Sequence, residues 1–500
     1  MPTSPSDDAV PAAPRADDPS AGAPHSGAPY DSASRDSSPY TGTPYDLAVV
    51  GAGPAGLAAA VAAGRLGLRV ALLDSAARTG GQFYRHPAPG LNARRPQALH
   101  HAWQAYAGRT RRLAALIAAG RVAHLAEHHV WAVTGAVGEW SVHTALGPDG
   151  AGERRTVRAA KLLLATGAHE RQLPFPGWTL PGVVGAGGAQ AVLKAGLVLP
   201  GRRIVVAGSG PLLLAVAGSL AAAGAEVPTV VEASGYVGYA RRPGALAANP
   251  GKLAEGAVHG IGLLRHRIPV RTRAAVTEVH GKDRVEAVTV MRLDHDWRPV
   301  PGTEKQIACD ALAVGHGLVP QLEPATGIGC ATRLTPDGTH ALVVDERQRT
   351  TVPGIWTAGE TGGVGGAELA MVEGELAALD IAGRQGPGRE SRARRRDRLR
   401  RFADAMAVAH APRPGWTAWL GDDTDVCRCE EVTAGEVREA VGELGARDAR
   451  TVKLLTRAGM GWCQGRMCGP AVDCLTGGAS GTAPRRPLAC PVTLERLAEG

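Results

Sequence analysis

Short apolar runs alternate with glycine-rich turns and alanine-rich stretches along most of the chain. The run 45–50, with the sequence Tyr-Asp-Leu-Ala-Val-Val, is typical of a buried strand. It leads into the turn 51–56 and an alanine-rich stretch at 54–67 that predicts a helix, and 69–74 predicts the next strand. Together these elements form a βαβ pattern of about 30 residues, which indicates a dinucleotide-binding domain.

A second βαβ pattern starts with the strand predicted at 203–207 and ends with the strand predicted at 229–232. Two further apolar runs, 161–167 and 311–315, each follow one of these units, and we interpret both as returns of the chain from one domain to the other. The last strand motif of the main body, 354–360, is followed by glycines and a helix. The first domain is therefore expected to be discontinuous, with the second domain inserted into it.

The first glycine turn has the chemistry of a pyrophosphate site. Gly51, Gly53 and Gly56 allow a tight turn, close approach of the backbone to phosphate, and close packing of the following helix, whose N-terminus stabilises phosphate charge. Asp74 ends the second strand, at the distance where a carboxylate accepts hydrogen bonds from ribose hydroxyls. The turn is therefore predicted to bind a dinucleotide.

The second glycine turn keeps Gly208 and Gly210, but Leu213 replaces the third glycine. Glu232 ends the following strand, and its carboxylate would repel a 2′-phosphate, so it favours NAD over NADP. The alternative is a domain that keeps its fold and has lost its nucleotide.

Four cysteines gather near the C-terminus, as a Cys-x-Cys pair, Cys427 and Cys429, and a Cys-x4-Cys pair, Cys463 and Cys468. Four thiolates can hold one iron–sulfur cluster. Zinc sites usually use pairs spaced by two to four residues, so the first pair fits zinc poorly. We favour the cluster over zinc and over simple burial, and we interpret Cys474 as a spare thiol.

Length and composition set the class of protein. A chain of 500 residues is expected to form about three domains. Much of its net charge of +8 lies in the arginine-rich run 389–401, which we interpret as a solvated helix. Because neither aromatic residues nor a known binding motif accompany this run, nucleic-acid binding is disfavoured.

Cysteine use and the N-terminal segment bear on location. A disulfide framework would not concentrate thiols in one segment of so large a chain, so a reducing cytoplasm is favoured. The first 40 or so residues, rich in Ala, Pro, Ser, Gly and Asp, are interpreted as a disordered extension rather than a signal peptide. No apolar stretch is long enough to predict a transmembrane span, so any membrane association would be peripheral, at the inner face.

Three kinds of active site are disfavoured because the residues that they need are missing or are not suitably spaced. A flavoprotein disulfide reductase needs a redox-active cysteine pair beside its flavin, and the segments 76–90 and 165–210 contain no cysteine. No Ser/His/Asp arrangement stands out, and the histidines show no paired metal-ligand spacing. No residue is assigned as a catalytic base.

Two segments resemble a known family. These are 165–184, with Ala-Thr-Gly-Ala-His-Glu-Arg at its start, and 457–468, with Arg-Ala-Gly-Met-Gly-Trp-Cys-Gln-Gly-Arg-Met-Cys. The chain from about residue 44 to 498 resembles flavoprotein subunits of bacterial heteromeric amino-acid dehydrogenases, including opine oxidase, D-hydroxyproline dehydrogenase and hydrogen cyanide synthase. It is also similar to the flavin region of the sarcosine oxidase alpha subunit.

The resemblance implies an α/β flavoprotein fold with two tandem Rossmann-like dinucleotide-binding domains, the FAD domain discontinuous, plus a small helical domain similar to bacterioferritin-associated ferredoxin. The boundaries expected are 1–42 for the extension, 43–170 with 310–385 for the FAD-binding domain, 171–309 for the NAD-binding-like domain, 386–420 for an arginine-rich helical linker, 421–480 for the [2Fe–2S] domain and 481–500 for the tail.

The resemblance also implies cofactor contacts. The expected FAD residues are Gly51, Gly53, Gly56, Asp74, Gly81, Gln82, Thr166, Gly167, Gly359 and Glu360; the expected NAD residues are Gly208, Gly210 and Glu232; the expected cluster ligands are Cys427, Cys429, Cys463 and Cys468. Glu360 stands where many relatives have Asp. The second cysteine pair is wider than in the small ferredoxin, which leaves the cluster type and fourth ligand open.

The expected function is electron transfer between FAD and an iron–sulfur cluster, within a heteromeric amino-acid or amine dehydrogenase. The implied partners are a second FAD-dependent subunit, with oxidase activity, and a small ferredoxin-like subunit. One alternative is an NADH-dependent reductase that delivers electrons through FAD and the cluster to an acceptor protein. Another is a non-catalytic assembly subunit that holds its cofactors only for structure.

Overall fold

A computed structural model describes residues 43–100, 102–478, 483 and 485–498. The predicted N-terminal extension, 1–42, lies outside the described residues, as does part of the predicted C-terminal tail.

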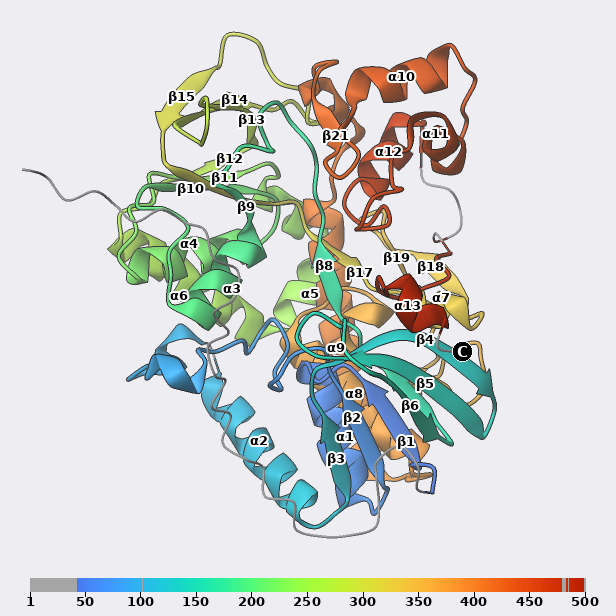
Figure 1. The fold of residues 1–500 in the computed structure, drawn as a ribbon. Coiled ribbons are helices and arrows are strands. Elements are labelled where there is room, and N and C mark those ends of the chain that lie inside the picture. Colours follow the sequence, from blue (N-terminus) through green and yellow to red (C-terminus); the bar gives the residue numbers. More distant parts are fainter. Residues whose placement is uncertain (1–42, 101, 479–482, 484, 499–500) are drawn as a thin grey trace, which may run out of the picture. The chain divides into compact units, whose positions relative to one another are not determined.

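The first domain is built on a five-stranded parallel sheet (Figure 1). Its central strand, β1, pairs with β2 on one side and with β7 on the other. The edge strand β20 comes from beyond the second domain and pairs with β7, so the sheet is discontinuous in sequence. In spatial order the strands are β20 (Ile355–Thr357), β7 (Leu162–Leu164), β1 (Leu47–Val50), β2 (Val70–Leu73) and β3 (Val122–Leu125).

Helices α1 (Pro54–Arg65) and α8 (Ala367–Ile381) pack against each other with their backbones in close contact. A Cβ atom added to Gly374 would lie 2.2 Å from the carbonyl oxygen of Ala55. The alanine and glycine content of both helices therefore serves close packing, since larger side chains would force them apart.

Between β2 and β3 the chain forms two short 3₁₀ turns and a longer helix, and between β3 and β7 it forms a three-stranded antiparallel sheet. Trp140 and Val142 of the middle strand are buried beneath the parallel sheet. These elements are η1 (Pro89–Leu91), η2 (Pro96–Leu99), α2 (Trp103–Ala118), β4 (His128–Ala136), β5 (Glu139–Leu146) and β6 (Arg154–Ala159).

The second domain contains another five-stranded parallel sheet and a three-stranded antiparallel sheet. In spatial order the parallel strands are β12 (Val270–Thr272), β11 (Val230–Glu232), β10 (Ile204–Gly208), β16 (Ala311–Gly315) and β9 (Val183–Gly185), and the antiparallel strands are β13 (Ala274–His280), β14 (Ala287–Arg292) and β15 (Lys305–Ala308). Its helices are α3 (Ala186–Gly196), α4 (Leu212–Ala222), η3 (Tyr236–Arg241), α5 (Pro243–Ala247) and α6 (Pro250–Arg265).

One predicted boundary differs from the structure. A boundary at residue 310 leaves β16 in the FAD-binding domain, whereas β16 pairs in parallel with β10 inside the second sheet. The strand is fully apolar and buried, so its own sequence fits either sheet, and only its pairing decides which domain contains it.

The two domains are joined by a short antiparallel pair of strands, β8 (Ala168–Glu170) and β17 (Leu318–Pro320). A small region follows β17 before the chain returns to the first sheet. It contains α7 (Glu323–Gly327), β18 (Thr332–Leu334) and β19 (His340–Leu342). The turn η4 (Gly359–Gly362) comes later, directly after β20.

The arginine-rich run lies in helix α9 (Pro387–His410). The interpretation of a solvated helix holds for only part of its surface. Arg394 is exposed, whereas Arg392 and Arg400 form ion pairs with Glu375 and Glu373 of α8 at 2.8 and 2.6 Å. The run therefore also attaches the linker to the first domain.

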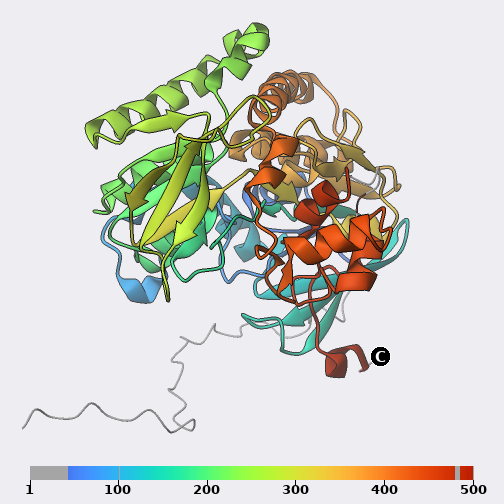
Figure 2. The same cartoon turned by 90° about the horizontal axis from the view of Figure 1, so that it is seen from above.

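The C-terminal module is small and mainly helical (Figure 2). Thr433 and Glu436 form a capping box at the start of α10, which fixes where that helix begins. The module contains η5 (Pro414–Trp419), β21 (Asp425–Cys427), β22 (Val432–Thr433), α10 (Ala434–Gly442), α11 (Ala449–Thr456) and α12 (Gly469–Leu475), and α13 (Leu494–Ala498) lies near the C-terminus. Among the described helices, none has the length and apolar character needed to cross a membrane.

We expect Gly374→Ala to destabilise the first domain by about 2 kcal/mol, because the new methyl group would collide with the backbone of α1. Urea unfolding followed by circular dichroism measures the shift. Gly256→Ala in α6 is the matched control, because nothing lies within 4 Å of its new Cβ. Since alanine favours a helix more than glycine does, the stability of this variant should be unchanged or slightly higher. Equal stability of the two variants would contradict the proposed close contact.

Candidate cofactor sites

The first glycine turn closes tightly at its ends and stays open in its middle. Gly51 has φ +102°, and a Cβ there would lie 2.2 Å from the carbonyl oxygen of Ala165. A Cβ on Gly56 would lie 1.7 Å from the Gly51 carbonyl oxygen, whereas one on Gly53 would meet nothing within 4 Å. The backbone at Gly53, at the N-terminus of α1, is therefore accessible to a phosphate group.

Asp74 lies beside this turn, at the end of β2. Its carboxylate accepts hydrogen bonds from the backbone N–H groups of Ala52 at 2.5 Å and Ala76 at 2.7 Å. Burial raises the pKa of this carboxyl above its usual value. Gly81 also packs against the turn, since its Cβ would lie 2.9 Å from the Cα of Gly53. The side chain of Gln82 instead accepts a hydrogen bond from Arg85.

The other predicted FAD residues lie at the carboxyl ends of β7 and β20, next to the first turn. The Thr166 hydroxyl donates to the Gln321 carbonyl at 2.6 Å, and Gly167 follows it in the crossing to the second domain. Gly359 has φ +82°, and its N–H donates to Glu373 at 2.9 Å. The tertiary fold thus gathers segments separated by some 300 residues in sequence at one edge of the sheet.

Glu360 has an additional role that its sequence position did not indicate. Its carboxylate accepts hydrogen bonds from the N–H groups of Gly365 at 2.7 Å and Gly366 at 3.0 Å, immediately before α8. Burial raises the pKa of this carboxyl. Contact of Glu360 with a flavin stays a prediction.

The second glycine turn has a different environment. Glu232 is completely buried, and its carboxylate accepts hydrogen bonds from the N–H groups of Gly210 and Ser234, both at 2.9 Å. Gly208 allows the turn to pass close to β16, since a Cβ there would lie 1.8 Å from the carbonyl oxygen of Gly315. The turn thus keeps the Rossmann geometry while enclosing its acidic residue.

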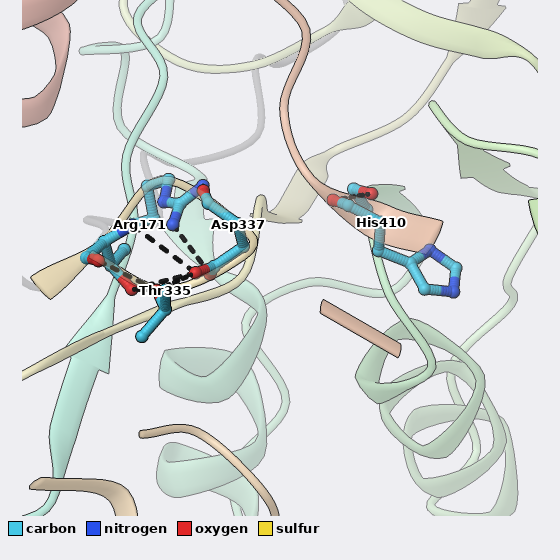
Figure 3. A network of polar contacts seen from close by, with 6 residues as sticks. Arg171, Thr335, Asp337 and His410 are labelled. Carbon is cyan, nitrogen blue, oxygen red and sulfur yellow. Dashed lines mark hydrogen bonds and ion pairs between the residues drawn. The ribbon is translucent and has the colours of Figure 1, made fainter. Parts of the chain in front are cut away.

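The end of helix α9 covers Glu232. Nδ1 of His410, the last residue of α9, lies 3.4 Å from a carboxylate oxygen of Glu232. The Ser209 hydroxyl donates to the His410 carbonyl at 3.0 Å, and the Tyr239 hydroxyl lies 3.1 Å from His410 Nε2 (His410 is shown in Figure 3). Burial and the nearby carboxylate raise the pKa of Tyr236 to about 12. The carboxylate predicted to face an NAD ribose is therefore covered by the chain's own helix.

The four predicted cluster cysteines form two pairs of different exposure. Cys427 and Cys468 are buried and hydrogen-bonded to each other, and this bond lowers the pKa of Cys427 to about 5. Cys429, which is exposed, and Cys463 form the second pair. Within the described part of the chain, no group of three or more His, Cys, Asp or Glu side chains is placed to hold one metal ion. The two pairs also interact with each other, since Cys427 lies near Cys429 and Cys463 lies near Cys468. The four thiols would therefore be able to hold one two-iron cluster.

Glycines in the segment around Cys463 and Cys468 allow it to approach Cys427 and Cys429. A Cβ on Gly461 would lie 2.2 Å from the Cβ of Cys429. The Gly459 N–H donates to Cys427 Sγ at 3.5 Å, and this donor stabilises negative charge on sulfur. The donor set therefore suits an anionic cluster.

Several residues that sequence reasoning missed hold the domains together. The Trp178 indole donates to the Asp425 carbonyl at 2.7 Å, joining the second domain to the cysteine module. Glu170 accepts hydrogen bonds from Gly187 and Gly188 at the start of α3. Trp178 and Glu170 lie in the family-specific segment 165–184, but residue type alone did not reveal their partners.

Arg171, in the same segment, is almost completely buried and forms an ion pair with Asp337 at 2.9 Å. Thr335 donates to Asp337 from the same loop, as Figure 3 shows. The pair attaches the chain after β8 to the loop between β18 and β19. Breaking it would leave a buried charge without its partner, which is costly.

The family "Pyridine nucleotide-disulphide oxidoreductase" matches residues 45–374, and the family "BFD-like [2Fe-2S] binding domain" matches residues 426–475. Hydrogen cyanide synthase subunit HcnB from Pseudomonas aeruginosa is 36% identical over 431 residues, covering 84% of this chain and 90% of the relative. An opine oxidase subunit from Agrobacterium tumefaciens is 35% identical, covering 85% of this chain and 84% of the relative.

Among solved structures, L-proline dehydrogenase from P. horikoshii has a TM-score of 0.63 at 22% identity, covering 91% of this chain and 79% of that one. This likeness concerns the fold. With the family matches, it confirms the predicted fold class of two dinucleotide-binding domains followed by a small helical iron–sulfur domain. The predicted resemblance and the predicted cofactors FAD and [2Fe–2S] are confirmed by the same matches.

Lys194 of α3 provides a pH-dependent prediction. Its ammonium is buried and donates to the Phe83 carbonyl at 3.1 Å, and burial lowers its pKa from 10.5 to about 8. Between these values the unfolded chain binds more protons, so stability rises with pH from about 8 towards 10. We expect Lys194→Met to be about 1–2 kcal/mol more stable at pH 7, with the difference shrinking over this range.

Urea unfolding at pH 7, 8 and 9 measures this difference. Exposed Lys305→Met is the control, and its difference from the native chain should not change with pH. If the difference in stability between Lys194→Met and the native chain were also independent of pH, the buried ammonium would be excluded as the cause of that difference.

Proposed function

Because the chain belongs to the pyridine nucleotide-disulphide oxidoreductase family, we propose that it is the electron-transferring flavoprotein subunit of a heteromeric amino-acid or amine dehydrogenase. The chain is an FAD-dependent oxidoreductase with a [2Fe–2S] domain, and its relatives are subunits of heteromeric enzymes. Transfer of electrons between the two cofactors is the further step that we propose.

One observation carries the choice between this function and an NADH-dependent reductase. Glu232, the residue expected to hold an NAD ribose, is fully buried beneath His410. An NADH-dependent reductase must bind its donor at each turnover. A covered ribose acceptor therefore favours a chain that receives its electrons from another subunit.

The residues of the first domain fit FAD. The backbone at Gly53 and the N-terminus of α1 would hold the pyrophosphate, and Asp74 would accept from the ribose. Cys427, Cys468, Cys429 and Cys463 would hold the cluster as two pairs. When bound, FAD accepts electrons as a pair and releases them singly, and a [2Fe–2S] cluster carries them one at a time.

The exposed thiol of Cys429 supports an electron-transfer role over a purely structural one. A cluster kept only to stabilise the fold has no need of a ligand at the surface, whereas Cys429 is exposed. Electron exchange with another protein requires close approach, and this face of the module provides it.

The proposal includes the partners expected from the sequence. A second FAD-dependent oxidase subunit would oxidise the C–N bond of an amine or amino acid, and a small ferredoxin-like subunit would complete the complex. A cytoplasmic location follows from the cysteine use and is part of the same proposal.

Anaerobic visible and EPR spectroscopy of the purified chain tests the function. We expect that neither NADH nor amino acids bleach the flavin of the isolated chain. Addition of a co-expressed oxidase subunit with its substrate should bleach the flavin and produce the signal of a reduced cluster. If NADH alone bleached the flavin, the chain would instead be an NADH-dependent reductase. If no donor reduced the flavin, the non-catalytic assembly role would be favoured.

The FAD site gives a separate prediction. Gly53→Ala should fold normally, because nothing lies within 4 Å of the new Cβ and the backbone has φ −66°. The methyl group would fill the space predicted for pyrophosphate, so FAD affinity should fall at least about tenfold, a loss of about 1.4 kcal/mol. Titration of flavin-free protein with FAD, followed by flavin fluorescence, measures it.

Gly218→Ala in α4 is the matched control, since it also places a methyl group in open space, but in the second domain. It should bind FAD with native affinity. If Gly53→Ala retains native affinity as well, the first turn is not the pyrophosphate site.

A further inference from the structure

Two arginines hold the backbone of the loop between Cys463 and Cys468. Arg466 donates from Nη1 to the Cys463 carbonyl at 3.1 Å and from Nη2 to the Ala489 carbonyl at 2.7 Å. Arg486 donates from Nε to the Gln464 carbonyl at 2.7 Å. The two guanidinium groups are thus fixed beside a predicted cluster ligand.

Both arginines converge on one carboxylate. Nε of Arg466 and Nη1 of Arg486 lie 3.0 and 2.6 Å from the same oxygen of Glu323. The Glu323 side chain is 4% exposed, and those of the arginines are 14% and 18% exposed. Because little water reaches these groups, their charges are weakly screened and act over several ångströms.

Glu323 is in turn connected to the predicted flavin site. It begins α7, two residues after Gln321, which pairs with the turn that ends β7. The Gln321 N–H donates to the Gly167 carbonyl at 2.9 Å, and its carbonyl accepts from the Thr166 hydroxyl at 2.6 Å. A continuous series of contacts therefore joins the predicted flavin turn, Glu323 and the cluster loop.

The nearby titratable groups complete the electrostatic description. His169, which faces Val319 across the β8–β17 pair, lies near Glu323 and Arg466, and burial lowers its pKa, so it is neutral at pH 7. Asp473 lies near Arg486, and burial raises its pKa to about 6. The charged side chains that face the cluster loop from this side are therefore Glu323, Arg466 and Arg486, with Asp473 beside Arg486.

We propose that Glu323, Arg466 and Arg486 are positioning residues that hold the cluster loop against the flavin domain and tune how readily the cluster is reduced. The inference rests on the proposed function and extends it. A cluster with four thiolate ligands is anionic and gains a further negative charge on reduction, so each guanidinium favours the reduced form and the carboxylate opposes it.

The test uses the full chain with flavin and cluster bound, in an EPR-monitored redox titration. At a fixed potential, Glu323→Gln should raise the ratio of reduced to oxidised cluster about tenfold, which equals about 59 mV for a one-electron couple. Arg486→Gln should lower the ratio by a similar factor. Variants that only lost packing would not be expected to change the ratio of reduced to oxidised cluster in opposite directions.

Glu226→Gln is the control, because it removes one carboxylate from the exposed pair with Arg203 in the second domain and should not shift the ratio. The proposal would be overturned if Glu323→Gln and Arg486→Gln changed the ratio of reduced to oxidised cluster in the same direction, or if neither changed it. A native chain without any reducible cluster would instead refute the proposed function, so the two failures are distinguishable.

Cluster content, measured by visible absorption, covers the case in which a variant loses the cluster. Glu323→Asp keeps the charge and should retain the cluster even if Glu323→Gln loses it, as a positioning role requires. Loss of the cluster in both variants would assign Glu323 to packing and would also overturn the proposal.

Discussion

The position of the cysteine module depends on a hydrophobic core that it shares with the second dinucleotide-binding domain. Trp178 and Val288 of that domain and Trp416, Val437 and Cys427 of the C-terminal part belong to one continuous group of buried residues. Burying a large aromatic side chain stabilises a fold by roughly 2–3 kcal/mol, so a core of this kind keeps the module fixed. Electron transfer falls steeply with distance, and a fixed module keeps that distance constant.

Helix α9 connects this arrangement to the first domain. Its arginines form ion pairs with α8, which itself packs on α1 next to the first glycine turn. Its last residue, His410, covers Glu232 at the second turn. One helix therefore attaches to the first domain and ends beside Glu232 at the second glycine turn.

The sequence contained most of the fold because its strongest signals are local. Buried strands, glycine turns and the acidic residue that ends each second strand recur within about 30 residues of each other, and βαβ geometry follows from them. The environment of Glu232 could not be predicted in this way. Its carboxylate meets a histidine 178 positions later in the chain, and nothing in either local segment indicates that contact.

The sequence by itself determined the two βαβ units, the glycine turn that contains Gly53 and the four clustered cysteines, because these depend on backbone conformation and spacing within short segments. Only the tertiary structure decided that β16 belongs to the second sheet and that Cys427 and Cys468 are buried while Cys429 is exposed. It also decided that Glu323 meets Arg486, 163 residues away. Such contacts depend on which distant surfaces fold together, and residue type and periodicity do not encode that choice locally.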